Sequence, residues 1–247
     1  MKSKIPARVR QRDRIAQLKL LSRFEKSLAK KVTTIIGEQG KNLAASYKAH
    51  GSVSINDLAE HKHQFLTILS QHYKRVMQAF ADRIRRSIKS NLFENVMAQW
   101  IATNGLSTID DIDSTTLSIV KTVINNGVED GLTRDAIALL IAQRTQQDVA
   151  YGRALVIART EMHVAANFAS MTAAEDTGLK LNKVWTSTLD GRTREAHQEA
   201  DGQSVPIDQP FDVDGEDVDH PGDGSAENAV NCRCTMVYEE VSTDNEE

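Results

Sequence analysis

The chain has 247 residues, which is enough for one or two domains with a sizeable core. Hydrophobic residues make up 40% and charged residues 26% of the chain, and this composition excludes a disordered protein. No apolar run reaches the ~18–20 residues of a membrane helix, and no apolar segment follows the first charged residues. We therefore expect neither a membrane span nor a signal peptide.

The net charge of −4 conceals two halves of opposite sign. Residues 1–100 carry 20 Lys and Arg against 7 Asp and Glu, whereas residues 101–247 carry 10 against 27. The sequence thus predicts a basic helical region over residues 1–106, an acidic C-terminal domain over 107–240 and an acidic tail over 241–247. A basic region of this kind can bind nucleic acid or an acidic protein surface.

Apolar residues spaced by three, four and seven predict a first helix from about Arg8 to Glu38, ended by Gly37 and Gly40. The same spacing predicts a second helix from about Asp57 to Ala102, whose length favours an elongated helical arm or hairpin over a compact enzyme core. The basic residues of the first helix are the candidates for docking on protein, which we prefer, or on DNA phosphates: Arg10, Arg12, Arg14, Lys19, Arg23, Lys26 and Lys30.

The C-terminal half predicts shorter elements. Helices are expected over about 114–126, 133–145 and 149–175, with Thr133 as a cap. A strand over 179–188 and a helix over 193–200 follow, then an acidic excursion over 203–230, either ordered or flexible, and a final strand over 231–241. The predicted fold class is therefore α+β, with long N-terminal helices before a small mixed domain.

The most informative residues lie in a fixed order over about residues 130–240. They are Arg159, Glu161, Asn167, Trp185, Asp190, Arg192, Arg194, His197, Asp201-Gly202, Pro221-Gly222-Asp223 and Asn231-Cys232-Arg233-Cys234. In this order and at this spacing the region resembles the Phage Mu F-like domain of minor head proteins from tailed bacteriophages. Some members place a His two residues before Asn-Cys-Arg-Cys, and this chain has Ala229 there.

The resemblance implies a role in head morphogenesis. Such proteins are minor capsid components, present in few copies and often near the portal, and they are linked to DNA packaging or ejection. The implied partners are portal and capsid proteins, with non-specific double-stranded DNA as a further partner and no membrane. The implied location is the virion head, after assembly in the host cytoplasm. The expected mechanism is binding rather than catalysis, without a cofactor.

The two cysteines, Cys232 and Cys234, are too close in sequence for an ordinary disulfide and would face the same side of a strand. With His197 and His220 they could form a Cys2His2 zinc site, but the spacing is not that of a zinc finger. The preferred interpretation has no metal, with the cysteines packed beneath the acidic loop and His197 holding a backbone group.

Two further interpretations concern the polar residues. Asp190 is expected to cap the following helix, with Arg192 or Arg194 paired to a carboxylate in a buried ion network that Arg159 and Glu161 could join. The alternative from another class is a hydrolase or transferase. It would use His197 with Cys232 or Cys234, or the Arg159/Glu161 pair.

Overall fold

The computed structural model describes residues 2–84, 91–146 and 150–241, and it divides the chain into two compact units. The sheet unit contains Met1–Glu25, Tyr73–Met97 and Arg159–Glu247, and the helical unit contains Lys26–His72 and Ala98–Ala158. Residues from both ends of the chain therefore share one unit. The predicted boundary near residue 106 lies inside a helix and stays a prediction.

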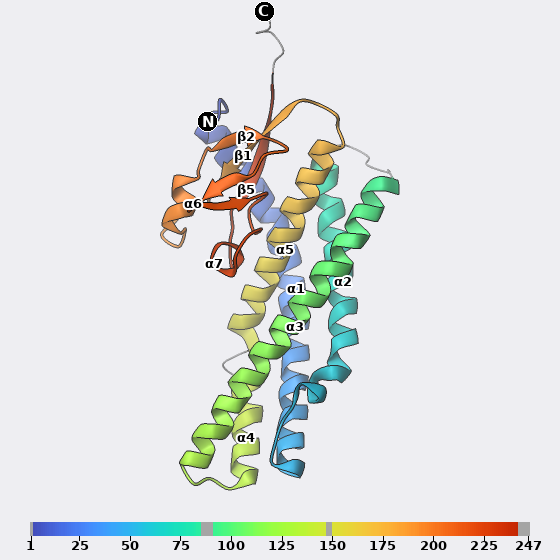
Figure 1. Ribbon diagram of the computed structural model, residues 1–247, viewed down its shortest axis with the longest axis vertical. Coiled ribbons are helices and arrows are strands. Elements are labelled where there is room, and N and C mark those ends of the chain that lie inside the picture. The colour runs from blue at the N-terminus through green and yellow to red at the C-terminus, as the bar shows by residue number, and fades with distance from the viewer. Residues whose placement is uncertain (1, 85–90, 147–149, 242–247) are drawn as a thin grey trace, which may run out of the picture. The chain divides into compact units, whose positions relative to one another are not determined.

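Five long or medium helices account for most of the chain (Figure 1). They are α1 (Ala7–His50), α2 (Ala59–Ile84), α3 (Asn91–Glu129), α4 (Arg134–Arg144) and α5 (Ala150–Glu175), with a 3-10 turn η1 (Ile55–Leu58) before α2. The predictions of helices over 133–145 and 149–175 are confirmed by α4 and α5. Thr133 caps α4 as expected, because its side chain accepts a hydrogen bond from the Ala136 amide.

Three predicted helix ends are wrong. The first helix continues through Gly37 and Gly40 to His50. The second helix ends at Ile84 rather than Ala102, and α3 then runs through Asn104-Gly105 and includes the predicted helix over 114–126. A glycine inside a helix costs only about 1 kcal/mol relative to alanine, so burial of Ile101 and Ile109 on either side of Gly105 outweighs that cost. Residues 85–90 lie outside the described residues.

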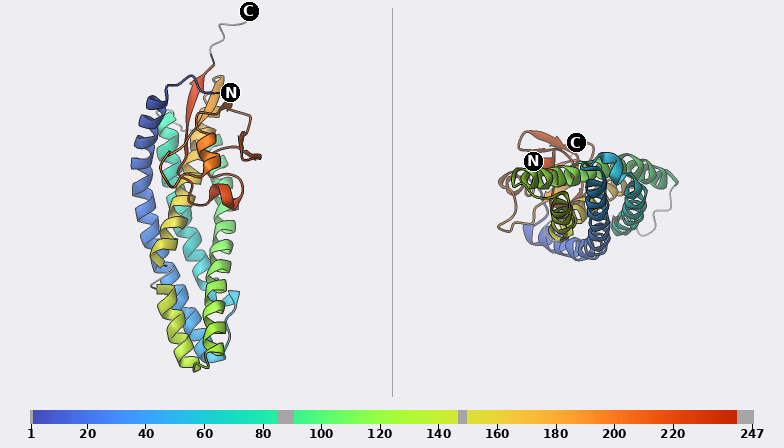
Figure 2. Two further views of the ribbon diagram at one scale, coloured as in Figure 1. Left: turned by 90° about the vertical axis from the view of Figure 1, so that its left-hand side faces the viewer. Right: turned by 90° about the horizontal axis from the view of Figure 1, so that it is seen from below.

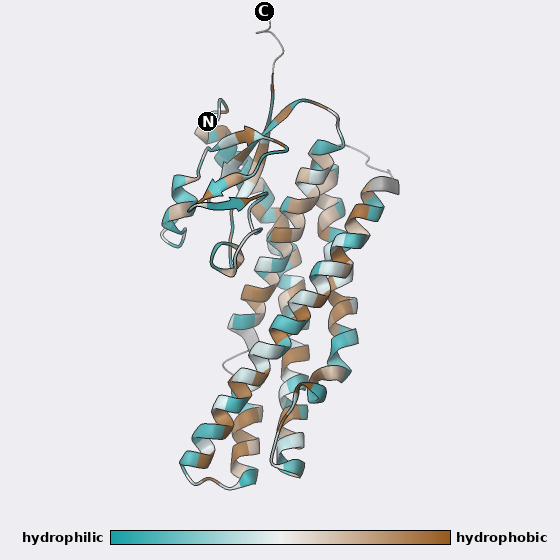
Figure 3. Ribbon diagram, in the orientation of Figure 1, coloured by the Kyte–Doolittle hydropathy of each residue, from teal (hydrophilic) through white to brown (hydrophobic). Residues whose placement is uncertain are grey.

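The helical unit is held together by an apolar cluster between α1, α3 and α4. The cluster contains Leu43, Tyr47, Leu58, Val120, Ile137 and Ile141, all buried. The helices lie side by side in both views of Figure 2, and Figure 3 shows apolar and polar residues recurring along each of them. A buried polar contact joins α1 to α3, where Gln39 Nε2 donates to Asp113 Oδ1 at 2.7 Å. Burial raises the pKa of Asp113.

The sheet unit contains a three-stranded antiparallel sheet with β1 in the middle. The strands are β1 (Leu181–Thr186), β2 (Ser204–Pro206) and β5 (Thr235–Glu240), in the order β2-β1-β5. β3 (Phe211–Val213) and β4 (Glu216–Val218) form a separate hairpin, and short helices α6 (Glu195–Glu199) and α7 (Ala226–Ala229) lie in the connections. The predicted strands and the helix after Asp190 are thus confirmed, and the acidic excursion over 203–230 is ordered.

The start of α1 packs in the sheet unit rather than standing apart. Gln11 Nε2 donates to the Ser187 carbonyl at 3.1 Å, and Gln17 Nε2 donates to the Met236 carbonyl at 3.0 Å. These bonds join the first turns of α1 to β5 and to the residue that follows β1. Among the described helices, none combines the length and apolar character needed to cross a membrane. Residues 242–247 of the predicted acidic tail lie outside the described residues.

Candidate functional site

A buried group of one histidine and two thiols lies in the sheet unit. His197 comes from α6, whereas Cys232 and Cys234 come from the segment that leads into β5. His197 Nδ1 lies 3.7 Å from Cys232 Sγ and 3.5 Å from Cys234 Sγ. The cysteines precede the strand instead of belonging to it, yet both sulfur atoms face the same ring nitrogen.

The other side of the His197 ring is held by an amide and a carboxylate. His197 Nε2 lies 3.3 Å from Asn228 Oδ1, and Asn228 Nδ2 donates to Glu216 Oε2 at 2.6 Å. Hydrogen bonds from Asn228 and Ser225 lower the pKa of Glu216. The sequence analysis did not identify Asn228 or Glu216, and no spacing rule connects them to His197.

Aromatic side chains pack around the thiol–imidazole group of His197, Cys232 and Cys234. The Trp185 ring meets the His197 ring edge to face, with centroids 5.4 Å apart, and meets Phe211 in the same way at 5.3 Å. Trp185 Nε1 donates to Ser187 Oγ at 3.0 Å, and Ser187 Oγ donates to the His197 carbonyl. This packing fixes the imidazole and keeps the group away from bulk water.

The two thiols have different acidities. The hydrogen bond from Cys232 lowers the pKa of Cys234, and contact with His197 lowers it further against the opposing effect of burial. The same bond and burial raise the pKa of Cys232. The hydrogen bond between the two sulfur atoms thus makes Cys234 the more acidic of the two thiols. A thiolate and a neutral imidazole are both metal ligands.

Asp190 forms a bidentate ion pair with a partner that the sequence analysis did not identify. Arg233 Nη1 and Nη2 donate to Asp190 Oδ2 and Oδ1, each at 2.7 Å, in a bidentate arrangement. Arg192 lies farther away, at 3.4 Å, and Arg194 Nη2 donates to the Val230 carbonyl instead of a carboxylate. The predicted capping role of Asp190 is wrong, because Arg194 occupies the N-cap of α6.

We expect the Asp190–Arg233 pair to stabilise the fold at neutral pH and to lose that effect in acid. Hydrogen bonds from Arg233 hold the Asp190 pKa well below its usual range, whereas an unfolded Asp has a pKa of about 3.9. Because the folded-state pKa is depressed, the stabilisation is present above about pH 4 and is lost as the pH falls through the folded value. The free energies of unfolding of wild type and Asp190→Asn should therefore differ most at neutral pH and converge in acid.

Urea titrations of both proteins at about pH 7 and about pH 3 measure this convergence. Asp208→Asn, at an exposed position in the same unit, is the control and should leave the unfolding free energy nearly unchanged at both pH values. An equal difference between wild type and Asp190→Asn at the two pH values would contradict the assignment.

A second polar cluster brings part of α5 together with α1 and α2. His163 Nε2 lies 3.1 Å from Glu25 Oε1, and Arg159 Nε lies 3.6 Å from Glu25 Oε2. Burial raises the pKa of Glu25, but its bonds and charge contacts with His163 and Arg159 outweigh that effect and lower it. Glu161 accepts a hydrogen bond from the Tyr73 hydroxyl at 2.6 Å. Arg159 and Glu161 therefore both have partners that hold helices together.

The remaining motif residues connect the loops to α5 and α1. Asn167 is buried and its Nδ2 donates to the carbonyls of Pro221, at 2.9 Å, and Cys234, at 3.2 Å. Asn231 Oδ1 accepts from Arg159 Nη1 at 2.7 Å. Gly202 has a positive φ of 76°, and an added Cβ would lie 2.9 Å from Arg10 Nη2.

His220 does not join the thiol–imidazole group. It is buried near Phe168, with ring centroids 6.0 Å apart, and its Nδ1 lies 3.3 Å from the Pro221 carbonyl oxygen. Within the described residues, the atoms that gather are those of His197, Cys232 and Cys234, all within 4.8 Å of one another. The four-residue zinc set considered from the sequence is therefore reduced to three.

The predicted docking residues on α1 divide into two groups. Arg10 is buried and binds Asp201 at 3.0 Å, and Arg14 is partly buried with its Nε 2.6 Å from Gln11 Oε1. Burial lowers the pKa of Arg14. The others are exposed: Arg12, Lys19 and Arg23 in the sheet unit, and Lys26 and Lys30 in the helical unit.

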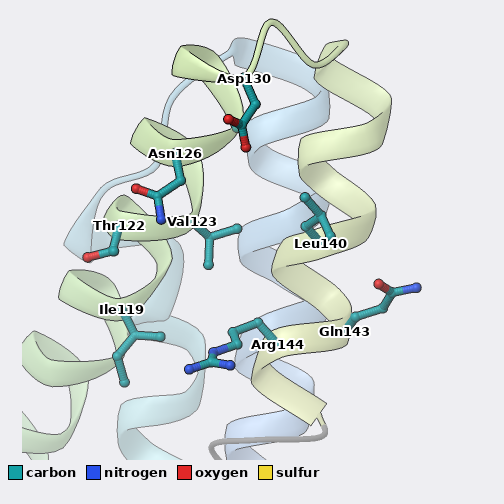
Figure 4. A pocket seen from close by; sticks show the side chains of 9 residues that line it. Ile119, Thr122, Val123, Asn126, Asp130, Leu140, Gln143 and Arg144 are labelled. Atoms are coloured by element: carbon teal, nitrogen blue, oxygen red, sulfur yellow. The ribbon is translucent and has the colours of Figure 1, made fainter.

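A surface hollow of about 610 Å³ lies between α3 and α4 in the helical unit (Figure 4). Its lining mixes apolar residues such as Val123 and Leu140 with polar ones. Figure 4 shows Asp130 and Arg144 at opposite ends of this hollow. The lining therefore offers no neighbouring pair of titratable groups for acid–base chemistry.

Comparisons with known proteins agree with the order of the motif residues. The family described as Phage Mu protein F like protein matches residues 118–237. Minor head protein GP7 of Bacillus phage SPP1 is 32% identical over 123 residues, which cover 48% of this chain and 39% of that protein. No solved structure matches.

Two further relatives carry different descriptions. The NAD(+)–arginine ADP-ribosyltransferase EFV of Enterococcus faecalis is 36% identical over 129 residues, covering 48% of this chain and 26% of that protein. An uncharacterized protein of Haemophilus influenzae is 28% identical over 225 residues, covering 90% of this chain and 42% of that protein. The chain thus spans less than half the length of each of these curated relatives. Residues 118–237, which contain the buried Cys–His group and the Asp190–Arg233 ion pair described above, match the Phage Mu F-like family.

Proposed function

We propose that this chain is a minor head protein of a tailed phage or prophage, acting in head morphogenesis by binding other head components. The observation that carries the proposal is the family match over residues 118–237 together with the relative named as a minor head protein. Its location is then the virion head, reached from the host cytoplasm during assembly. Its partners are the portal and inner capsid proteins.

The geometry of the motif residues fits binding rather than catalysis. His197 and both thiols are buried, Arg159 contacts Glu25 of α1, and Glu161 accepts a hydrogen bond from Tyr73 of α2. A catalytic pair must reach a substrate, whereas these groups contact one another and the surrounding core. The motif thus acts as the internal framework of the sheet unit.

The docking surface that we propose is the exposed basic side of α1. Arg12, Lys19 and Arg23 are exposed and spaced by seven and four residues, which places them on one side of the helix. Lys26 and Lys30 continue the spacing along the sequence. Positive charge at helical spacing suits an acidic protein rim, and it also suits the phosphates of packaged DNA without reading base sequence.

The experiment uses the full chain, because residues 1–25 belong to the sheet unit. A triple variant, Arg12→Ala with Lys19→Ala and Arg23→Ala, is compared with a matched triple variant at exposed basic positions of the same unit, Lys74→Ala, Arg75→Ala and Lys180→Ala. Each is co-expressed with the portal and major capsid proteins of its phage. We expect the first variant to lose co-purification and the second to retain it; equal retention contradicts docking through this surface.

DNA binding is tested in a separate experiment. Binding of duplex DNA is measured over a series of salt concentrations, because each lost phosphate contact reduces the slope of log K against log salt by about 0.9. The α1 triple variant should reduce that slope, and the matched variant should not. If the affinity of the wild-type protein for duplex DNA does not change with salt, DNA is not a partner through phosphate contacts.

A second candidate function is a transferase, which the similarity to the Enterococcus faecalis protein favours. That similarity covers 26% of the relative, so most of the protein that carries the name lies outside the match. The test is incubation of the full chain with NAD(+) and arginine-containing acceptors, followed by measurement of nicotinamide release. Release that disappears in Glu161→Gln or His197→Gln would establish an enzyme and overturn the binding role.

A further inference from the structure

The arrangement of two thiols around one imidazole nitrogen is more than a hydrogen bond requires. A neutral imidazole has a single lone pair, which can accept one S–H donor. In this structure Cys232 Sγ and Cys234 Sγ both approach His197 Nδ1, at 3.7 and 3.5 Å. A common ion between the three atoms would place both sulfur atoms at nearly the same distance from one nitrogen, as is observed.

The distances agree with tetrahedral zinc. Zn–S bonds of about 2.3 Å and a Zn–N bond of about 2.05 Å at the tetrahedral angle place sulfur and nitrogen about 3.6 Å apart and two sulfurs about 3.8 Å apart. The observed separations of sulfur from nitrogen fall on either side of that value. All three ligand atoms lie within 4.8 Å of one another, as the expected sulfur–sulfur separation requires.

The residues around His197 orient its ring as a metal ligand. Because Asn228 Nδ2 donates to Glu216, the Asn228 oxygen faces the ring and accepts the Nε2 proton. The Nδ1 lone pair is then free to point toward the thiols. A ligating histidine usually donates its other N–H to an oxygen in this way, and such partners fix both its tautomer and its orientation.

The sulfur atoms also have supporting contacts. The Cys234 amide lies 3.5 Å from Cys232 Sγ and donates to it, whereas Cys234 Sγ donates to Ser187 Oγ at 3.7 Å. An N–H donor of the first kind stabilises negative charge on the Cys232 sulfur. Cys232, Cys234 and His197 are all nearly inaccessible to solvent, as structural zinc ligands usually are.

We propose that His197, Cys232 and Cys234 bind one zinc ion through Nδ1 and two thiolates, with a solvent oxygen as the fourth ligand. Binding releases the thiol protons to solvent. The ion joins α6 to the segment before β5, two parts of the sheet unit that lie 35 and 37 residues apart in sequence. The packing interpretation of the sequence did not include this ligand.

The test is the metal content of the full chain, purified without a histidine tag from zinc-containing medium. We expect one zinc per chain in wild type and in His220→Gln, because His220 is buried in the same unit but outside the group. Cys232→Ser, Cys234→Ser and His197→Gln should each lose the metal. Zinc retained in these three variants, zinc lost from His220→Gln, or copper in place of zinc would overturn the assignment.

A second measurement does not depend on whether the variants fold. Wild-type protein is stripped with a chelator and titrated with Co²⁺, whose tetrahedral thiolate complexes have a visible spectrum and a sulfur-to-metal charge-transfer band. We expect both signals to saturate at one equivalent, and we expect chelation to lower the melting temperature of wild type. Wild type that contains no zinc, shows no thiolate band and melts at the same temperature with or without chelator would refute the proposal.

Discussion

Gly40→Ala is expected to destabilise the helical unit, whereas Gly37→Ala, three residues earlier on α1, is expected to stabilise it. A Cβ added at Gly40 would lie 1.8 Å from Thr145 Oγ1 and 2.4 Å from Thr145 Cβ, both far inside van der Waals contact. Thr145 cannot easily turn away, because it is buried and its hydroxyl donates to the Ile141 carbonyl at 2.8 Å. The helices must separate, and the expected loss is about 1–3 kcal/mol of unfolding free energy.

Gly37 is the matched control, since nothing lies within 4 Å of the position of its added Cβ. Alanine in a helix interior is favoured over glycine by about 0.5–1 kcal/mol, so Gly37→Ala should raise the free energy of unfolding. Urea titrations followed by circular dichroism measure both changes. A shift of the two variants in the same direction would show that Gly40 does not mark a close approach between α1 and the end of α4.

These two glycines also show what sequence periodicity can and cannot predict. Glycine after an amphipathic run is a usual helix stop, and the sequence analysis assigned Gly37 and Gly40 that role. A glycine that ends a helix and a glycine that lets another helix approach look the same in sequence. Only the position of Thr145, more than one hundred residues away, distinguishes them. Where the signal is local, as with the Thr133 cap of α4, the prediction is confirmed.

The candidate site likewise contains residues that the sequence could indicate and residues that it could not. The Cys232-x-Cys234 spacing and the nearby His197 were visible in sequence, and the order of the motif residues was enough to indicate the family. The residues that orient them were not. Asn228 lies in an acidic segment without periodic pattern, and the sequence analysis gave Arg233 no partner, whereas it pairs with Asp190, 43 residues earlier. These contacts depend on the tertiary arrangement of the loops, which local sequence patterns do not predict.

Arg10→Ala is expected to destabilise the sheet unit strongly, although Arg10 belongs to the basic series from which the docking surface was predicted. Its side chain is only 9% exposed, and its Nη2 lies 3.0 Å from Asp201 Oδ2. Its Nη1 donates to the Ile5 carbonyl at 3.0 Å. On the other side, Asp201 Oδ1 accepts from the Ser187 amide at 2.9 Å. Arg10 therefore connects the start of α1 to the loop beside the thiol–imidazole group.

Removing one partner of a buried ion pair costs about 3–5 kcal/mol, because the remaining charge is left without compensation. The exposed Arg12→Ala, two residues away, should change the unfolding free energy by no more than about 0.5 kcal/mol. Urea unfolding of the two variants measures the contrast, and similar values for both would mean that Arg10 is not part of the internal framework. The portal and DNA binding assays, run at equal concentrations of folded protein, should show the opposite contrast. Substituting the exposed Arg12, Lys19 and Arg23 should reduce binding, whereas Arg10→Ala should not reduce it. We therefore expect positive charge on α1 to have two separable roles, and we expect burial to decide which role each residue has.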